Sequence, residues 1–448
     1  MSTIETTQKR FDGPWIQGRD AALPTWVRAG KAPDERPRYD SVVIRGNGVG
    51  ALTLAGRLAR SQSFAGKVVV AAPKPVESRK LINGCTLRSR SIDYYAAAFA
   101  TTRKDVLEAI FGARHPEAEA HQQFGSICSP RADGSFVLEN CKPWMNSSAQ
   151  GGRPMAYGTR NGRLVGALGE LLAPLPHVWV PELPKSLDGC RELALGQNPL
   201  ILNATHEPLE GTPAKAKPTR FVVASQTTFT APRRRELGFV ADHGSFVGGV
   251  RRDGNLDVGV YYPFADPLSP AAEYYGIFYR IVEPGAGLDK AGELARMHET
   301  VVGVGRGFGL EPLDEDETHA TAMVPCSPWQ DDVSRHRGFI DFEAIYGAGA
   351  PIITGCGMAR AGLAGYVTAE AILAGADPIE LTNASLVRWR RLNRIFAACM
   401  TDLSGPATAI LRRIPNPALG WIADWSDTWS GVAGAPVRDA GAAARDAA

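Results

Sequence analysis

The chain has 448 residues, of which 44% are hydrophobic and 21% are charged, and its formal net charge is +2. This length predicts two or three domain-sized units with a sizeable apolar core. A net charge so close to zero does not favour nucleic acid as a partner. The 7 cysteines show no C-x-x-C spacing and the 8 histidines no H-E-x-x-H pattern, so we expect neither a disulfide scaffold nor a metal site.

The two ends of the chain differ in composition from its centre. Residues 1–39 are rich in proline, glycine and charge and predict a surface tail, and the alanine-rich residues 436–448 predict a disordered tail. The first ten residues, MSTIETTQKR, are polar and show no secretory signal. No uninterrupted apolar run reaches the roughly 18 residues of a membrane span. We therefore expect a cytoplasmic protein.

Residues 40–59, DSVVIRGNGVGALTLAGRLA, form the most informative segment. A β-branched strand is followed by a glycine turn of the G-x-G-x-x-A type and then by an apolar helix. A second apolar strand, KVVVAA, spans residues 67–72 and completes a βαβ unit. Such a turn can hold a pyrophosphate on backbone N–H groups, whereas the alternative is a structural loop that binds nothing. The turn residues are Gly46, Gly48, Gly50 and Ala51.

The middle of the chain predicts further helices and strands. We expect an amphipathic helix over 160–172 and a longer helix over 269–303. The turn Asp253-Gly254-Asn255 predicts a β-hairpin between strands 245–250 and 256–262. Other predicted strands are 178–180, 200–203, 221–224, 226–230 and 320–324.

A second glycine-rich stretch, GAPIITGCGMARAGLAGYVTAEAILAG, spans residues 349–375. A short apolar strand runs into Gly355-Cys356-Gly357, and Gly362 and Gly365 precede a helix. A second glycine-rich helix start so far along the chain is unusual.

Taken together, the two stretches resemble the FAD-dependent oxidoreductases of the p-hydroxybenzoate hydroxylase and geranylgeranyl reductase group. The resemblance implies an α/β fold, with a Rossmann-like FAD-binding domain, an inserted antiparallel β-sheet substrate domain and a helical C-terminal region. It also implies that the first turn holds the pyrophosphate, that the late turn contacts the flavin, and that residues 79–88 run near the flavin. The cofactor-binding residues expected on this basis are Gly46, Gly48, Gly50, Ala51, Arg79, Arg88, Gly355, Cys356, Gly357 and Gly362.

Three acidic positions of that group are replaced in this chain. Residues 71–73, Ala-Ala-Pro, stand where the group has the carboxylate that binds the adenosine ribose. Cys356 stands in place of an aspartate, and Ala204-Thr205-His206 in place of a central Asp-Gly motif. If FAD binds, backbone groups or a serine, threonine or arginine side chain must make these contacts.

The resemblance also predicts how the chain divides into domains. An N-terminal tail (1–39) precedes the first part of the FAD-binding domain (40–219), the substrate domain (220–330) and the second part of the FAD-binding domain (331–380). C-terminal helices (381–435) and the tail (436–448) complete the chain.

The expected function is that of a flavin-dependent oxidoreductase, a monooxygenase that acts on an apolar or aromatic small molecule. Because the sequence has no separate nicotinamide fingerprint, NAD(P)H would visit transiently or a reductase partner would supply electrons. A non-redox flavin-dependent cyclase or isomerase and a flavin-fold scaffold without catalysis stay open as alternatives.

The pattern assigns no catalytic base. His206 is a candidate acid or base, although a loop histidine bonded to backbone is the preferred interpretation. Tyr261 and Tyr262 alternate on a strand, so one of them faces inward. Three tryptophans at spacing four (Trp421, Trp425, Trp429), downstream of Arg388, Arg390 and Arg391, predict a helix that docks on the protein body, with weak membrane-surface contact as the alternative.

Overall fold

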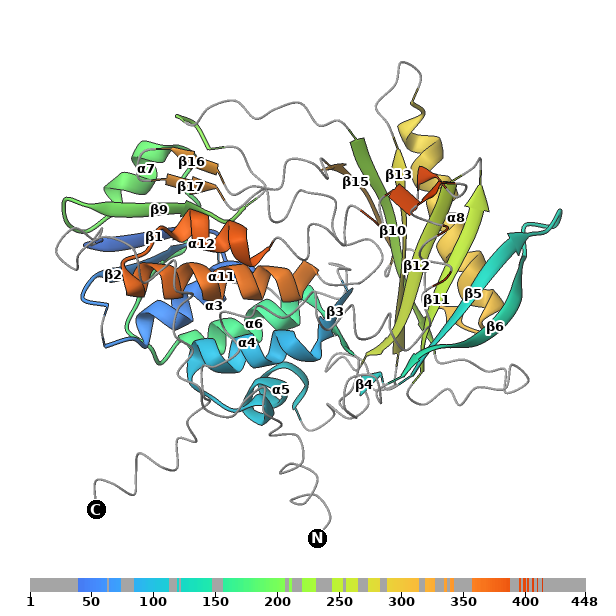
Figure 1. Ribbon diagram of the computed structural model, residues 1–448, viewed down its shortest axis with the longest axis horizontal. Helices are drawn as coiled ribbons and strands as arrows, with labels where there is room; N and C mark the ends of the chain where they lie inside the picture. The colour runs from blue at the N-terminus through green and yellow to red at the C-terminus, as the bar shows by residue number, and fades with distance from the viewer. Residues whose placement is uncertain are drawn as a thin grey trace, which may run out of the picture.

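The computed structural model contains two β-sheets, each covered by helices (Figure 1). It describes residues 39–62, 64–73, 84–112, 119–120, 122–146, 156–205, 209–211, 220–230, 244–252, 255–264, 273–282, 288–313, 319–326, 334–336, 339–341 and 357–386, with single positions between 395 and 413. In the described part, no helix combines the length and the apolar character needed to cross a membrane. The same part holds no group of three or more His, Cys, Asp or Glu side chains suited to a metal ion.

The first sheet, sheet A, has six strands in the order β16-β17-β9-β1-β2-β8. From β17 to β8 all neighbouring strands are parallel. The chain adds β2 and β8 on one side of β1 and then crosses to add β9 and β17 on the other, which makes a topological switch point between β1 and β9. The strands are β1 (Ser41–Arg45), β2 (Lys67–Ala71), β8 (Val178–Val180), β9 (Pro199–Asn203), β16 (Ser334–His336) and β17 (Phe339–Asp341).

Helices cover both faces of sheet A. Alternation along β1 explains the two faces, because Val42 and Ile44 join the core under α3 while Val43 packs against Leu187 and Cys190 of α7. The predicted helix over 160–172 is confirmed as α6. The helices are α3 (Val49–Ala59), α4 (Ser89–Phe99), α5 (Arg103–Phe111), α6 (Asn161–Leu172), α7 (Leu187–Glu192), α11 (Gly357–Ala374) and α12 (Pro378–Ser385).

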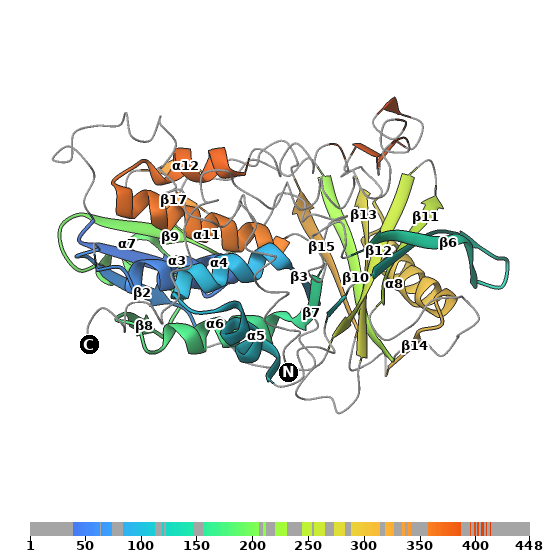
Figure 2. The ribbon, with the colours of Figure 1, turned by 60° about the horizontal axis from the view of Figure 1, so that its bottom comes forward.

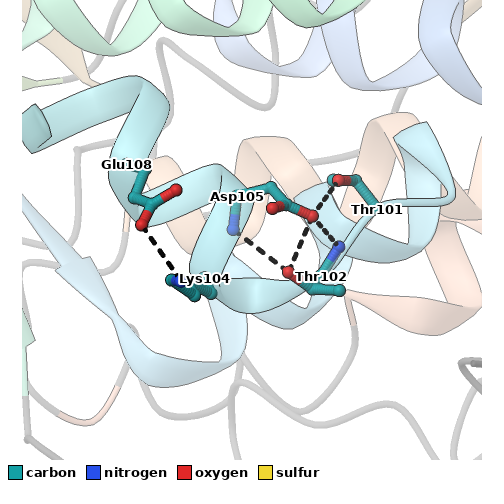
Figure 3. Close-up of polar contacts among 5 residues, drawn as sticks. All are labelled: Thr101, Thr102, Lys104, Asp105 and Glu108. Carbon is teal, nitrogen blue, oxygen red and sulfur yellow. Dashed lines mark hydrogen bonds and ion pairs between the residues drawn. The ribbon is translucent and has the colours of Figure 1, made fainter.

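A capping box fixes the start of α5, as Figure 3 shows. The Thr102 side chain accepts from the Asp105 N–H at 3.1 Å, and the Asp105 carboxylate accepts from the Thr102 N–H at 2.9 Å. The Thr101 hydroxyl adds a third bond to the same carboxylate, at 2.7 Å. These bonds lower the pKa of Asp105, with the threonine hydroxyls as the main cause.

The second sheet, sheet B, has eleven strands along the path β14-β10-β13-β12-β11-β5-β6, with β15, β3, β4 and β7 attached to it. The predicted hairpin is confirmed by the antiparallel pairing of β11 with β12. Helix α8 (Lys290–Gly307) packs on one face, and Figures 1 and 2 both place it on the side turned away from sheet A. The strands are β3 (Gly84–Arg88), β4 (Glu119–Ala120), β5 (Gln122–Pro130), β6 (Phe136–Asn146), β7 (Ala156–Arg160), β10 (Arg220–Thr230), β11 (Gly244–Arg252), β12 (Asn255–Phe264), β13 (Glu273–Val282), β14 (Glu311–Pro312) and β15 (Ala320–Cys326).

The structure corrects the predicted helix over 269–303. Residues 273–282 are strand β13, and among the described residues of this range the helix begins only at residue 290. The β13 segment EYYGIFYRIV is apolar on both faces because it lies in the middle of sheet B, so it lacks the alternation that marks a half-buried strand. The predicted strands 221–224 and 226–230 are a single strand, β10.

Sheet B also takes strands from the segment that the sequence assigns to the FAD-binding domain. Strands β3 to β7 lie within 84–160 and pair with one another or with β11 and β12. The domain boundary at residue 219 stays a prediction, but sheet B, on which the predicted substrate domain is built, already takes strands from residue 84 onward.

Candidate functional site

The first glycine turn lies at the switch point of sheet A. Gly46 follows β1 directly and has φ +116°, a conformation that L side chains rarely adopt. A Cβ at Gly46 would lie 2.8 Å from the carbonyl oxygen of Ala204, so the residues after β9 also require a glycine here. The Gly46 N–H donates to the Ala71 carbonyl at 2.9 Å. The turn is thereby held between the ends of β9 and β2.

Helix α3 begins in this turn with backbone donors that the helix itself does not use. Its N-cap is Gly48, which offers no side-chain cap, and the first intrahelical bond runs from the Leu52 N–H to the Gly48 carbonyl at 3.0 Å. The N–H groups of Val49, Gly50 and Ala51 therefore have no acceptor within the helix. Together with the positive end of the helix dipole, such groups suit a phosphate.

The second glycine stretch lies directly on the first. Helix α11 crosses α3 so closely that a Cβ on Gly365 would lie 2.2 Å from the Gly50 carbonyl oxygen and 3.1 Å from the Gly50 Cα. An ion pair between Arg57 of α3 and Glu370 of α11 ties the two helices one turn further along. The structure therefore brings together the two segments that the resemblance requires to be neighbours.

A buried ion pair lies where strand β7 of sheet B passes into helix α6. Arg160, at the end of β7 and the start of α6, contacts Glu273 of β13 at 3.2 Å, and both side chains are about 5% exposed or less. Since an unpaired charge at such a site would cost several kcal/mol, each side chain requires the other. The pair holds the start of α6 against sheet B.

The face of sheet B opposite α8 forms an apolar wall. Tyr261 is excluded from it, because its hydroxyl donates to the Val301 carbonyl of α8 at 2.6 Å and its burial raises its pKa well above the ordinary value. Tyr262 lies on the other face and stacks on Tyr275, with ring centroids 6.0 Å apart. The buried residues of this wall are Val222, Val247, Val258, Val260, Tyr262, Tyr275 and Ile281.

Comparison with known proteins identifies the fold. No protein-family model matches the sequence, and no curated protein matches it. Among solved structures, a salicylate hydroxylase in its substrate complex superposes with a TM-score of 0.54 at 11% identity, over 88% of this chain and 97% of the other. The chain has the flavin monooxygenase fold. Two further matches are a 2,6-dihydroxypyridine-3-hydroxylase from Arthrobacter nicotinovorans (TM-score 0.48, 13% identity, 83% of this chain and 96% of that one) and a tryptophan 6-halogenase from Streptomyces toxytricini (0.48, 12%, 88% and 88%).

The end of β2 differs from the carboxylate-bearing edge expected of a flavin monooxygenase fold. The Ala72 carbonyl accepts from the Trp179 indole N–H at 2.9 Å, and the Pro73 carbonyl accepts from the Asn47 amide at 2.6 Å. An amide from the glycine turn thus stands beside this strand end. A ribose hydroxyl arriving here would meet Asn47 and these two carbonyls.

Arg45 is a site residue that the sequence reasoning missed. It is 1% exposed, and its guanidinium donates to the Pro184 carbonyl at 2.6 Å, to Asn203 Oδ1 at 2.8 Å and to the Thr205 hydroxyl. It thereby ties the end of β1 to the residues that replace the central Asp-Gly motif. An arginine that ends an otherwise apolar strand immediately before the first glycine is the sequence signal that marks it.

The other predicted site residues divide into three sets. Gly357 begins α11, and Gly362 lies one turn later, where a Cβ would be 2.6 Å from the ring of Tyr95 in α4. Gly362 therefore permits close helix packing. Arg88 ends β3, on which α11 packs, but its side chain lies outside the described residues. Arg79, His206, Gly355 and Cys356 lie outside them entirely, as do the three tryptophans near the C-terminus. That any of these residues binds a cofactor stays a prediction.

The described cysteines are poorly suited to chemistry. Cys190 is buried under β1, and burial raises the pKa of its thiol to about 11 although the nearby Arg45 opposes this. Because the thiolate is the nucleophile, Cys190 is unreactive near neutral pH. Cys128 and Cys399 are buried as well.

Proposed function

We propose that this protein is a flavin-dependent oxidoreductase whose reaction is the monooxygenation of an apolar or aromatic small molecule. The observation that carries the proposal is the contact of α3 with α11 at Gly50 and Gly365, because it packs the middle of the late glycine-rich helix against the glycine turn that begins α3 at the switch point of the sheet. Ligands of open α/β sheets bind at such switch points. The flavin monooxygenase fold supports the same cofactor.

The residues present fit FAD at its diphosphate. The N–H groups of Val49, Gly50 and Ala51 would hold the two phosphates, and the side chain missing at Gly48 leaves room for them. Arg45 would act indirectly, by fixing the residues after β9 against the turn. At the ribose the fit lacks a negative charge, since residues 71–73 have no carboxylate and the Asn47 amide lies beside them.

When bound, the flavin supplies electron transfer that no protein side chain performs. The chain's own residues bind, orient and shield it. The N-terminus of α11 would stabilise negative charge close to it, because the helix dipole is positive there. The wall of sheet B would exclude water and accept an apolar substrate. NAD(P)H would visit transiently, or a reductase partner would supply the electrons.

The experiment is NAD(P)H oxidation by the FAD-loaded protein, measured with and without salicylate, indole and 1-naphthol as aromatic probes. We expect at least one probe to accelerate oxidation about tenfold or more. The variant Gly48→Glu should abolish the response, because its charge and bulk occupy the phosphate turn. Equal rates with and without every probe, in protein that retains FAD, would contradict monooxygenation.

A flavin-dependent cyclase or isomerase without net redox turnover is the second candidate. It is favoured by one specific observation: the end of β2 has no carboxylate, and its Pro73 carbonyl accepts from the Asn47 amide, so the cofactor environment is less acidic than the resemblance implies. Retained FAD that NAD(P)H never reduces, together with conversion of a polyene or other apolar substrate, would support this candidate.

A further inference from the structure

The two faces of strand β10 carry different chemistry. Its register with β13 is unbroken, so alternate residues face opposite sides of sheet B. Val223 and Phe229 pack in the core under α8. Ser225 and Thr227 alternate with the same spacing, so they face the same side of the sheet. Val222 belongs to the opposite wall, and Thr228 lies on the same face as Val222 because the two are six positions apart along the strand. Thr228 therefore lies on the face of sheet B opposite α8, and Figures 1 and 2 place α8 on the side of that sheet turned away from sheet A.

The Thr228 side chain is an unusual element of this wall. The residue is 0% exposed, and its Oγ1 has no hydrogen-bond partner in the described part of the chain. Buried hydroxyls are nearly always satisfied, and one that is not costs free energy. Valine has almost the same shape and would avoid this cost. A threonine at this position therefore calls for a partner that the ligand-free chain does not supply.

The neighbours of Thr228 indicate the kind of partner. Thr228 is paired across the sheet with Tyr275, and Tyr275 is paired with Tyr262. The two tyrosine rings stack with an interplanar angle of 21°. The next rung of the wall holds Ile277 and Val260. Buried polar side chains also flank this row, since Gln226 is paired with Ile277 on one neighbouring rung and Glu273, which is ion-paired with Arg160, lies on the other. The Thr228 hydroxyl thus stands at the end of a flat row of two stacked tyrosine rings.

We propose that Thr228 Oγ1 hydrogen-bonds a hydroxyl or carbonyl group on a planar aromatic substrate that lies along the Tyr275–Tyr262 row. The inference rests on the proposed function, whose substrate class it narrows. Because Thr228 is fully buried, the ligand group reaches it from the interior between the two sheets and not from bulk solvent. Thr228 would then distinguish oxygenated aromatics from their methyl counterparts.

Ser225 provides a matched control on the same strand. It is also fully buried, and its Oγ also has no hydrogen-bond partner among the described residues, but it faces the packed core under α8. An unsatisfied hydroxyl alone therefore does not identify a binding position. The inference depends on which face the hydroxyl occupies, and Ser225→Ala tests that dependence directly.

The experiment is calorimetric titration of the full chain with matched probe pairs, phenol against toluene and 1-naphthol against 1-methylnaphthalene. We expect the wild-type protein to prefer the hydroxylated member of at least one pair about fivefold, the size of one net hydrogen bond. Thr228→Val should remove this preference, and Ser225→Ala should retain it. No preference in the wild type for either pair, or an unchanged preference in Thr228→Val, would overturn the proposal.

Two further measurements separate the possible causes of failure. The melting temperature of ligand-free Thr228→Val should equal or exceed that of the wild type, since an unsatisfied hydroxyl is removed. A clear decrease would show that Oγ1 is already bonded and would overturn the proposal. FAD content is measured by absorbance in each sample, so a protein without flavin would contradict the proposed function independently of probe preference.

Discussion

The carbonyl oxygen of Gly50 lies where a side chain on Gly365 would have to begin. The separation of 2.2 Å to a built Cβ is far below any normal contact, and the atom met is backbone, which cannot rotate away. Position 365 is therefore restricted to glycine by the backbone of position 50. The contact sets the distance between α3 and α11.

Gly365→Ala should separate these helices. We expect a loss of about 1–3 kcal/mol in the free energy of unfolding, as for other overpacked interiors, together with weaker FAD binding. Gly166→Ala in α6 is the matched control, because a Cβ there meets nothing within 4 Å. That control should gain up to about 1 kcal/mol from helix propensity. Urea unfolding of both variants checks this, and equal stability of the two would show that the contact is absent.

Arg45→Leu should destabilise the switch point. It removes the donor to Pro184, Asn203 and Thr205 and leaves these acceptors buried. We expect a loss of about 2–3 kcal/mol and FAD affinity reduced about tenfold or more, measured by fluorescence quenching. Arg45→Lys should recover only part of the stability and part of the FAD affinity, because a lysine ammonium cannot reproduce the planar set of donors on the arginine guanidinium. Full recovery by lysine would mean that charge alone is needed.

Ala100→Gly should stabilise the protein. Ala100 follows α4 with φ +51°, and the Thr101 N–H donates to the Ala96 carbonyl at 3.0 Å, which is the Schellman arrangement that favours glycine. We expect a gain of about 0.5–1 kcal/mol, seen as a higher melting temperature. Ala97→Gly, within the helix, should instead cost about 1 kcal/mol. A lower melting temperature for Ala100→Gly would contradict the assigned backbone conformation.

Tyr366→Phe should reduce the protein's sensitivity to alkali. Burial raises the pKa of Tyr366 in α11 to about 12, and Glu370 adds to the shift. Because the folded pKa exceeds the unfolded value near 10, this group's contribution is complete below pH 10 and is lost as pH rises from about 10 to 12. The loss is about 2–3 kcal/mol. Between about pH 10 and pH 12, the free energy of unfolding should therefore fall less in the variant than in the wild type. An equal fall in both proteins would contradict the burial of this hydroxyl.

The parts of the fold that depend on local pattern could be predicted from the sequence. The unit β1-α3-β2 is such a case, since its strands, its glycine turn and its helix are adjacent along the chain. The hairpin of β11 and β12 is another. Strand β13 could not be recognised, because a strand buried on both faces has no period that separates it from a buried helix.

The site could be predicted only in part, because its remaining features depend on tertiary contacts. Nothing near Gly365 in the sequence shows that it contacts Gly50, and nothing near Arg45 shows that its acceptors come from Pro184 and Asn203. The unsatisfied hydroxyl of Thr228 is likewise visible only once the faces of β10 are known. Sequence reasoning found the turns and missed the side chains that hold them.

The most direct test of the central claim is a titration of the purified chain with FAD, followed by flavin fluorescence quenching and by the visible absorbance of the protein after gel filtration. The wild type and Gly166→Ala should each retain about one FAD per chain, whereas Gly48→Glu should retain none while staying folded by circular dichroism. No flavin on the wild-type protein, or equal retention by Gly48→Glu, would contradict the claim that these two helix starts enclose a flavin.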